Sequence, residues 1–253
     1  MTNYRSGLAL LCAAVLSACG QDAIQTLVAT NPGAHIKFYN FGVGAPDVNF
    51  YADQTKVTAV SSSTGTEATT GTAYGKSGNG GFYSGVEPKA YVLAGKIASA
   101  TNNGVAISTL NATLADGKYY SFYQSGIYDA TAKTVDSFIV EDPFPSQIDF
   151  STANVRFVNA ISNSSPMTLY AKETTSGVEA PVGAEISYKG AGAFTALPSG
   201  IYNLSTRTTG SSTNVISLNG ITILAGRLYT VTAGGDMTST TTTKPFLDNS
   251  VNR

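Results

Sequence analysis

The sequence predicts an all-β protein that contains two tandem immunoglobulin-like β-sandwich domains. Three observations support this fold class: apolar and polar side chains alternate along short segments, turn-forming residues separate these segments, and several blocks occur twice in the same order. Alternation with a period of two is typical of β-strands that cover a core with one face. After the N-terminal segment, no stretch sustains the 3.6-residue period of an amphipathic helix.

The internal repeat consists of five pairs of blocks, of which the first two recur at an offset of 119 residues and the fourth at an offset of 109. The second copy is therefore shorter between these blocks. The corresponding blocks are residues 35–40 and 154–159, 50–52 and 169–171, 90–93 and 201–204, 117–122 and 226–231, and Pro143-Phe144 and Pro245-Phe246. A repeat of this length encloses its own core, so it predicts a whole domain rather than a solenoid unit.

The repeat sets the domain boundaries that we expect. They are a signal peptide over residues 1–18, a lipidated cysteine and tether over 19–33, a first β-sandwich over 34–145, a linker over 146–151 and a second β-sandwich over 152–253. Each copy has about seven short strands, which fits an immunoglobulin-like sandwich better than a closed eight-stranded barrel. The Cys-Trp-Cys signature of antibody domains is absent, since the chain has no Trp.

An outer-membrane β-barrel is the main alternative, because its strands also alternate at every second residue. Such a barrel requires longer, more regular strands and an unbroken apolar outer face. The Ser-rich and Thr-rich segment over residues 61–72 favours the sandwich instead.

The N-terminus has the pattern of an export signal. Arg5 precedes an apolar run over residues 8–18, which is too short to span a bilayer. The run ends in Leu16-Ser17-Ala18-Cys19, which resembles the bacterial lipobox, with its first three residues for recognition by the signal peptidase and Cys19 for lipidation. An ordinary secretory signal followed by a chance cysteine is the alternative.

Localisation and partners follow from this pattern and from the composition. Gly20 stands where an Asp would favour retention in the inner membrane, so we expect a lipid-anchored protein of the outer membrane. Cys12 leaves with the signal and Cys19 carries the lipid, so the mature chain has no disulfide. Several acyl chains anchor a protein firmly although no segment spans the bilayer. Charged residues make up only 12% of the chain and form no basic cluster, which excludes nucleic acid as a partner.

Residues 36–53, with the core Ala45-Pro46-Asp47-Val48-Asn49-Phe50-Tyr51, resemble the bacterial and archaeal family called domain of unknown function 4397. Family members open with an alternating strand that ends in Asn or His, a turn with small residues and Pro, and a second strand that ends in Tyr. Residues 155–170 fit the same pattern, and residues 117–120 and 226–229 are similar to the family's late Gly-x-x-Tyr strand. The resemblance implies a surface or periplasmic lipoprotein with tandem sandwich domains, and it brings no catalytic residues.

Few residues are candidates for chemistry, and we expect no catalytic site, metal site or cofactor. His35 is the only histidine, and we expect it to be solvated at a strand end. The Gly-rich residues 75–81 lack the Lys-Ser/Thr ending of a phosphate loop, so a hairpin loop is expected there. The acidic residues are interpreted as charged strand ends that prevent edge pairing, with a calcium site as the alternative. These residues are Asp129, Asp136, Glu141 and Asp142.

Six tyrosines of the first copy could either pack within the sandwich or form a binding surface. Packing across neighbouring strands is the simpler explanation, and an exposed platform for a sugar or a protein is the alternative. The residues are Tyr74, Tyr83, Tyr91, Tyr119, Tyr120 and Tyr123.

Taken together, these patterns predict a non-enzymatic lipoprotein of the cell envelope with a binding or structural role. Its expected partners are the membrane, through the N-terminal lipid, and a protein or polysaccharide ligand. The alternatives are an accessory or adhesin-like module of a polysaccharide-handling complex, and a hydrolase that uses a pair of carboxylates.

Overall fold

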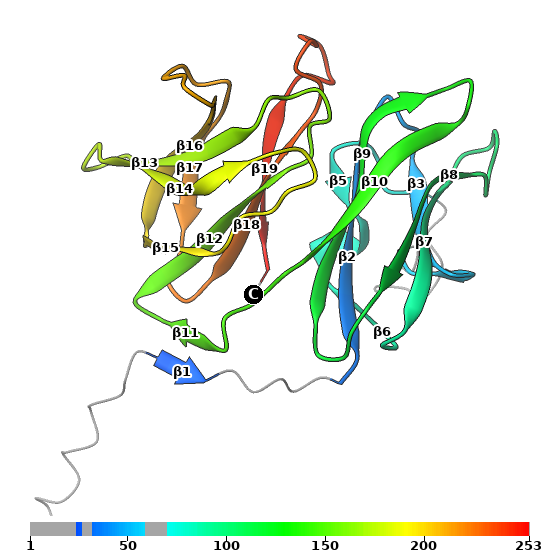
Figure 1. Cartoon of the computed structure of the whole chain (residues 1–253), viewed down its shortest axis with the longest axis horizontal. Coiled ribbons are helices and arrows are strands. Elements are labelled where there is room, and N and C mark those ends of the chain that lie inside the picture. Colours follow the sequence, from blue (N-terminus) through cyan, green and yellow to red (C-terminus); the bar gives the residue numbers. More distant parts are fainter. Residues whose placement is uncertain (1–23, 27–31, 59–69, 253) are drawn as a thin grey trace, which may run out of the picture.

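The computed structural model describes residues 24–26, 32–58 and 70–252 (Figure 1). These residues form strands, one short 3-10 turn and no α-helix, which confirms the all-β prediction. None of their elements is a helix long and apolar enough to cross a membrane. The expected signal peptide, the recognition residues Leu16, Ser17 and Ala18, and the lipidated Cys19 lie outside the described residues.

The first module, defined here as β2 to β10, consists of two sheets in the described residues. One sheet has the strand order β10-β9-β2-β5, with β6 also paired to β2, and the other has the order β4-β3-β7-β8. The strands are β2 (Ala34–Val43), β3 (Val48–Ala52), β4 (Thr55–Lys56), β5 (Lys76–Ser77), β6 (Ser84–Val86), β7 (Ala90–Ile97), β8 (Ala106–Thr113), β9 (Tyr119–Asp129) and β10 (Thr134–Glu141).

The second module, defined as β12 to β19, has the sheets β15-β12-β18-β19 and β14-β13-β16-β17. Its strands are β12 (Thr152–Asn159), β13 (Met167–Glu173), β14 (Glu179–Ile186), β15 (Thr195–Pro198), β16 (Gly200–Thr208), β17 (Ile216–Ile223), β18 (Leu228–Gly234) and β19 (Phe246–Val251). The two modules lie side by side in Figure 1, with the first module at the right.

Both modules pair their strands in the same register. The opening strand of each lies parallel to the penultimate one, with His35 opposite Tyr119 in the first module and Asn154 opposite Leu228 in the second. These four residues are related by the two offsets, 119 and 109, that the sequence repeat displays. The repeated blocks of the opening and penultimate strands therefore occupy the same positions in the two modules.

Each module encloses its own apolar core between its two sheets. In the first module the core includes Ile36, Phe38, Phe50 and Phe122, and the rings of Phe38 and Phe50 stack with centroids 5.1 Å apart. In the second module the same positions of the opening strand, Val155 and Phe157, are buried. The alternate residues of each opening strand thus supply the core, as their period of two predicts.

A buried asparagine lies in the last part of the opening strand of each module. Asn159 donates its amide hydrogens to the Ser164 hydroxyl and the Ile186 carbonyl, while its Oδ1 accepts the N–H of Ile161. Asn40, its equivalent, donates to the carbonyls of Pro46 and Thr72. The asparagine therefore ties the opening strand to later segments of its module, which gives the Asn of the repeated pattern a structural role.

The segment expected to be a free tether is partly paired. β1 (Ile24–Thr26) forms an antiparallel ladder with β11 (Gln147–Asp149), which lies in the expected linker. Backbone hydrogen bonds therefore fasten the part of the chain before the first module to the connection between the modules (Figure 1).

We predict that Asn159→Ala lowers the free energy of unfolding by about 3 kcal/mol, because two buried backbone groups, the Ile161 N–H and the Ile186 carbonyl, lose their partner. Chemical denaturation followed by circular dichroism measures the loss. Asn111→Ala on β8 is the matched control, since that side chain is exposed, and it should change stability by less than about 0.5 kcal/mol. Equal effects of the two substitutions would contradict the structural role.

Candidate functional site

The outward face of β2 is covered by the second module. Lys37, Tyr39 and Phe41 alternate with the core residues of β2 and are all buried. The Tyr39 ring stacks on Tyr123 at a centroid distance of 4.7 Å, and Phe41 meets Phe246 of the second module edge to face at 5.2 Å. The sheets β10-β9-β2-β5 and β15-β12-β18-β19 therefore pack face to face, and this intermodule interface has an apolar centre.

An ion pair with no solvent exposure joins the two modules at this interface. Arg156, on β12, donates from Nη2 to Oδ1 of Asp142, and both side chains are fully buried. Its Nη1 donates to the Glu141 carbonyl at 3.0 Å, and its Nε donates to the Thr230 hydroxyl at 3.0 Å. The guanidinium thus has a carboxylate and a carbonyl partner across the interface and a hydroxyl partner within its own sheet.

The second oxygen of Asp142 is also fully used. Oδ2 accepts the Tyr83 hydroxyl at 2.6 Å and the Ser121 hydroxyl at 2.8 Å. The expectation that Asp142 is a charged strand end that prevents edge pairing is therefore wrong, because its carboxylate is buried against the second module. A strand-end position shows where an acidic residue lies along its own sheet, but it does not show whether another sheet covers it.

A second cation crosses the interface in the opposite direction. Lys37 occupies on β2 the position that Arg156 occupies on β12, and its Nζ donates to the Val251 carbonyl at 3.0 Å and to Asn252 Oδ1 at 3.2 Å. The N–H groups of Asp142 and Asn252 make the same backbone contact in their modules, to the carbonyls of Tyr119 and Leu228. Asp142 and Asn252 are therefore equivalent positions.

This equivalence corrects one correspondence of the sequence repeat. Pro143-Phe144 follows β10, whereas Pro245-Phe246 lies at the start of β19, so the two dipeptides are not counterparts. The two short motifs match by chance in sequence, while backbone pairing aligns β10 with β19 through Asp142 and Asn252.

The two ends of the interface differ in charge. Arg156 meets the carboxylate of Asp142, whereas Lys37 meets the neutral amide of Asn252. Among the described residues no carboxylate forms an ion pair with Lys37. Burial lowers the pKa of Lys37 to about 8, opposed by the more distant Asp142 and Asp248 and reinforced by Arg156.

The remaining acidic residues of the predicted cluster lie apart. Asp136 contacts Lys189 and Tyr188 of the second module, Glu141 pairs with Lys118, and Asp129 accepts the N–H groups of a turn. The hydrogen bonds from Lys189 and the Ser137 N–H outweigh the effect of burial and hold the pKa of Asp136 below its usual value. In the described part of the chain, no group of three His, Cys, Asp or Glu side chains could hold a metal ion.

His35 is packed against a neighbouring ring, and the Gly-rich segment belongs to regular secondary structure. His35 is only 8% exposed and stacks on Tyr119 at 4.5 Å, so the expected solvated histidine is a buried one instead. Stacking on a neighbouring parallel strand covers a side chain that a strand-end position alone would expose. Residues 75–81 form β5 and the 3-10 turn η1 (Gly78–Gly81), and the segment that follows is extended.

The tyrosines of the first module serve mainly in packing. Tyr91 and Tyr120 belong to the core of the first module, and Tyr123 is buried at the intermodule interface. Tyr83 and Tyr119 line the edge of that interface, where their rings meet at 5.0 Å. Burial raises the pKa of Tyr83. The negative charge of the nearby Asp142 raises it further, because it disfavours an ionised hydroxyl there.

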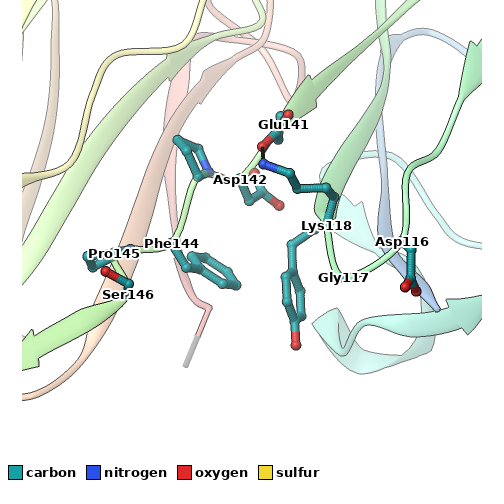
Figure 2. A pocket seen from close by; sticks show the side chains of 10 residues that line it. Asp116, Gly117, Lys118, Glu141, Asp142, Phe144, Pro145 and Ser146 are labelled. Atoms are coloured by element: carbon teal, nitrogen blue, oxygen red, sulfur yellow. Dashed lines mark hydrogen bonds and ion pairs between the residues drawn. The ribbon is translucent and has the colours of Figure 1, made fainter. Parts of the chain in front are cut away.

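Two hollows open near the intermodule interface. Figure 2 shows the first, of about 280 Å³, in which Lys118 reaches Glu141, and Phe144, Pro145 and Ser146, which follow β10, form one side. Asp116, on the far side, accepts the N–H of Gly33. The charged groups of this hollow therefore already have partners within the protein.

The second hollow, which we call the intermodule groove, lies at the Lys37 end of the interface and has a volume of about 510 Å³. Both modules contribute to it. Its defining residues are Lys37, Phe82 and Tyr83 of the first module and Arg227, Asp248 and Asn249 of the second.

The intermodule groove contains side chains with unused binding capacity. Phe82 is 76% exposed, and the exposed Arg227 side chain makes no hydrogen bond or ion pair among the described residues. Asp248 accepts the Ser250 hydroxyl, and burial raises its pKa. The groove therefore offers a ring and a cation to a ligand.

The fold and the interface define a class of all-β protein in which two sandwich modules pack against each other. Residues 153–253, nearly all of the second module, match the model of the family described as domain of unknown function (DUF4397). This confirms the family resemblance for the second module. The first module has the same strand order but lies outside the matched residues.

No curated protein matches the chain. Among solved structures, the chain is similar to the Bacillus anthracis TIE protein, with 14% identity, a TM-score of 0.24 and coverage of 79% of this chain and 33% of that one. A leucine-rich repeat protein from Bacteroides thetaiotaomicron VPI-5482 gives 11% identity, a TM-score of 0.20 and coverage of 78% and 25%. Wild-type pneumolysin gives 12% identity, a TM-score of 0.21 and coverage of 61% of this chain and 32% of that one. The chain thus spans about a third or less of these proteins, and likenesses this weak place no constraint on its function.

We predict that Asp142→Ala lowers the free energy of unfolding by about 3–5 kcal/mol, because Arg156 keeps a buried charge without its carboxylate. The double variant Arg156→Met/Asp142→Leu should recover most of this loss, since it removes both charges. Differential scanning calorimetry measures both. Glu141→Ala, which removes the adjacent carboxylate from an exposed ion pair, is the control and should cost less than about 1 kcal/mol. An Asp142 effect no larger than this control would show that the buried pair does not hold the modules.

Proposed function

We propose that this protein is a non-enzymatic lipoprotein of the bacterial cell envelope that is anchored through Cys19 and binds a ligand in the intermodule groove. The groove carries the binding part of the proposal, because its two walls come from different modules. The expected export signal and lipobox motif Leu16-Ser17-Ala18-Cys19 carry the localisation.

Preorganisation supports a binding role for the intermodule groove. Arg156 and Asp142 fix the two modules relative to each other, and Asp136 adds an ion pair to Lys189 across the same interface. A ligand that enters the groove therefore meets walls that are already in place, which reduces the entropy lost on binding. The groove volume of about 510 Å³ lies in the range typical of small-ligand sites.

The state of the carboxylates supports a role without catalysis. Glycoside hydrolysis requires two carboxyl groups that face a shared substrate position. Here Asp142 is enclosed by Arg156, Tyr83 and Ser121, and Glu141 pairs with Lys118. The one acidic residue that defines the intermodule groove, Asp248, has no second carboxylate among the other defining residues.

The pairing of β1 with β11 supports an anchor close to the folded body. Cys19 precedes Ile24 by only five residues, which reach at most about 18 Å when fully extended. An anchor at Cys19 would hold the linker side of the two modules near the membrane surface.

We predict that Cys19→Ser abolishes lipidation and moves the protein from the membrane fraction to the soluble fraction. The reason is that the thiol is the only acceptor of the lipid in the motif. Metabolic labelling with a palmitate analogue, followed by fractionation, measures both effects. Cys12→Ser, within the expected signal, is the matched control and should leave labelling unchanged. Membrane association of Cys19→Ser at the level of the unmodified protein would refute the anchor.

We predict that Phe82→Ala reduces binding to lipid-free envelope polymers about tenfold, because exposed aromatic rings in a fixed site carry much of the binding energy. Co-sedimentation of the full exported chain carrying Cys19→Ser measures this affinity. Ile201→Ala, an exposed apolar residue on β16, is the control and should have no effect. If neither substitution changes binding, or if no polymer binds, the groove has no role in ligand binding.

A further inference from the structure

We infer that the intermodule groove binds a carboxylated sugar whose acid group is taken by Lys37 and Arg227. This inference rests on the proposed function and names the ligand class of the same site. Two requirements of the groove lead to it: a negative charge and a flat apolar face.

The requirement for negative charge follows from the reciprocal construction of the interface. Lys37 and Arg156 are equivalent cations, and each donates to a backbone carbonyl and a side-chain oxygen of the opposite module. Even the aromatic contacts correspond, because Lys37 lies 4.3 Å from the centroid of Tyr83 and the Arg156 guanidinium lies 5.1 Å from that of Phe194. The carboxylate of Asp142 has no counterpart at the Lys37 end, where Asn252 takes its place.

The Lys37 ammonium has capacity left for an anion. Of its three N–H donors, two are used by the Val251 carbonyl and Asn252 Oδ1, which leaves one for a ligand, and the nitrogen lies 4.3 Å from the centroid of the Tyr83 ring. A buried ammonium without a carboxylate is unfavourable, so an incoming anion would gain more here than at a solvated lysine. Lys37 is 2% exposed and lines the groove, so the ammonium, which lacks a carboxylate partner among the described residues, lies at the groove wall.

The charges that define the intermodule groove favour an anion as well. Arg227 is exposed and unpaired in the described part of the chain, and together with Lys37 it gives two cations. Asp248 is the single acidic residue among the six defining residues, and Lys76 lies near enough to act on it electrostatically. The groove therefore has an excess of positive charge in a protein whose formal net charge is −1.

The exposed Phe82 ring selects a sugar among anions. It offers an apolar face, against which the C–H face of a sugar ring can stack. A carboxylated sugar meets both requirements in one unit.

The experiment measures binding of a galacturonic acid tetramer to the detergent-solubilised lipoprotein by isothermal titration calorimetry. A neutral galactose tetramer and acetate are the matched probes. We expect the acidic tetramer to bind at least tenfold more tightly than the neutral one. Arg227→Gln should reduce the affinity for the acidic tetramer about tenfold, which corresponds to a charge-assisted hydrogen bond, and leave the neutral one unchanged. Lys118→Gln, an exposed cation outside the groove, is the matched control.

Asn252→Asp tests the role of Lys37 without removing a buried residue. It supplies the missing carboxylate from within the protein, so it should lower the affinity for the acidic tetramer at least tenfold while the melting temperature is maintained or raised. Retained affinity in this variant, or equal binding of the two tetramers, overturns the inference but leaves the groove as a binding site. Competition by acetate at the same concentration as the acidic tetramer shows an adventitious ion only. Binding of neither tetramer, together with polymer binding that depends on Phe82, means that the ligand belongs to another class.

Discussion

The buried ion pair between Arg156 and Asp142 is the interaction on which the arrangement of the two modules depends. A planar guanidinium directs its N–H groups along fixed lines, and here they reach a carboxylate, a backbone carbonyl and a hydroxyl at once. Apolar contacts such as that of Phe41 with Phe246 tolerate small rotations, whereas these hydrogen bonds do not. The ion pair therefore contributes mainly orientation, since two fully buried charges gain little net stability from each other.

The repeat in the sequence becomes a reciprocal interface in three dimensions. Because the modules pack through the same sheet, equivalent side chains such as Lys37 and Arg156 reach across in opposite directions. An interface of this kind resembles the isologous contact of a symmetric dimer, in which each contact occurs twice. The substitution of an amide at Asn252 for the carboxylate at Asp142 breaks that symmetry at one end.

Several features of this structure follow from the sequence alone. The alternation along residues 36–41 predicts a strand with Ile36 and Phe38 on one face and Lys37 and Tyr39 on the other, and the structure has this arrangement. The change of repeat offset from 119 to 109 agrees with the register of β2 with β9 and of β12 with β18. Local patterns and repeat spacing carry this information because strand pairing within a module uses short-range alternation and shared ancestry of the blocks.

What covers the outward face could not be predicted in the same way. A period of two separates the faces of a strand, but it does not distinguish a face in water from one against another module. Lys37 and Asp142 are polar, so local reasoning places them in solvent, and only the approach of a second sheet buries them. His35 is covered instead by the ring of Tyr119 on the neighbouring strand. A signal was nevertheless present: the two copies both carry a cation at one outward position, Lys37 and Arg156, in a chain with only 12% charged residues.

The difference between the two ends of the interface explains why the larger hollow lies where it does. At the Arg156 end, Phe144 of the segment that follows β10 packs against Phe194, and the cation, the carboxylate and the rings all contact one another. At the Lys37 end, the ammonium is bound only by neutral oxygens, and Phe82 and Arg227 project without partners in the described part of the chain. One end thus completes its interactions within the protein and holds the modules together. At the other end, the cations lack carboxylate partners within the residues that the structure describes. Cations that lack such partners and are held in a fixed geometry are suited to binding a ligand.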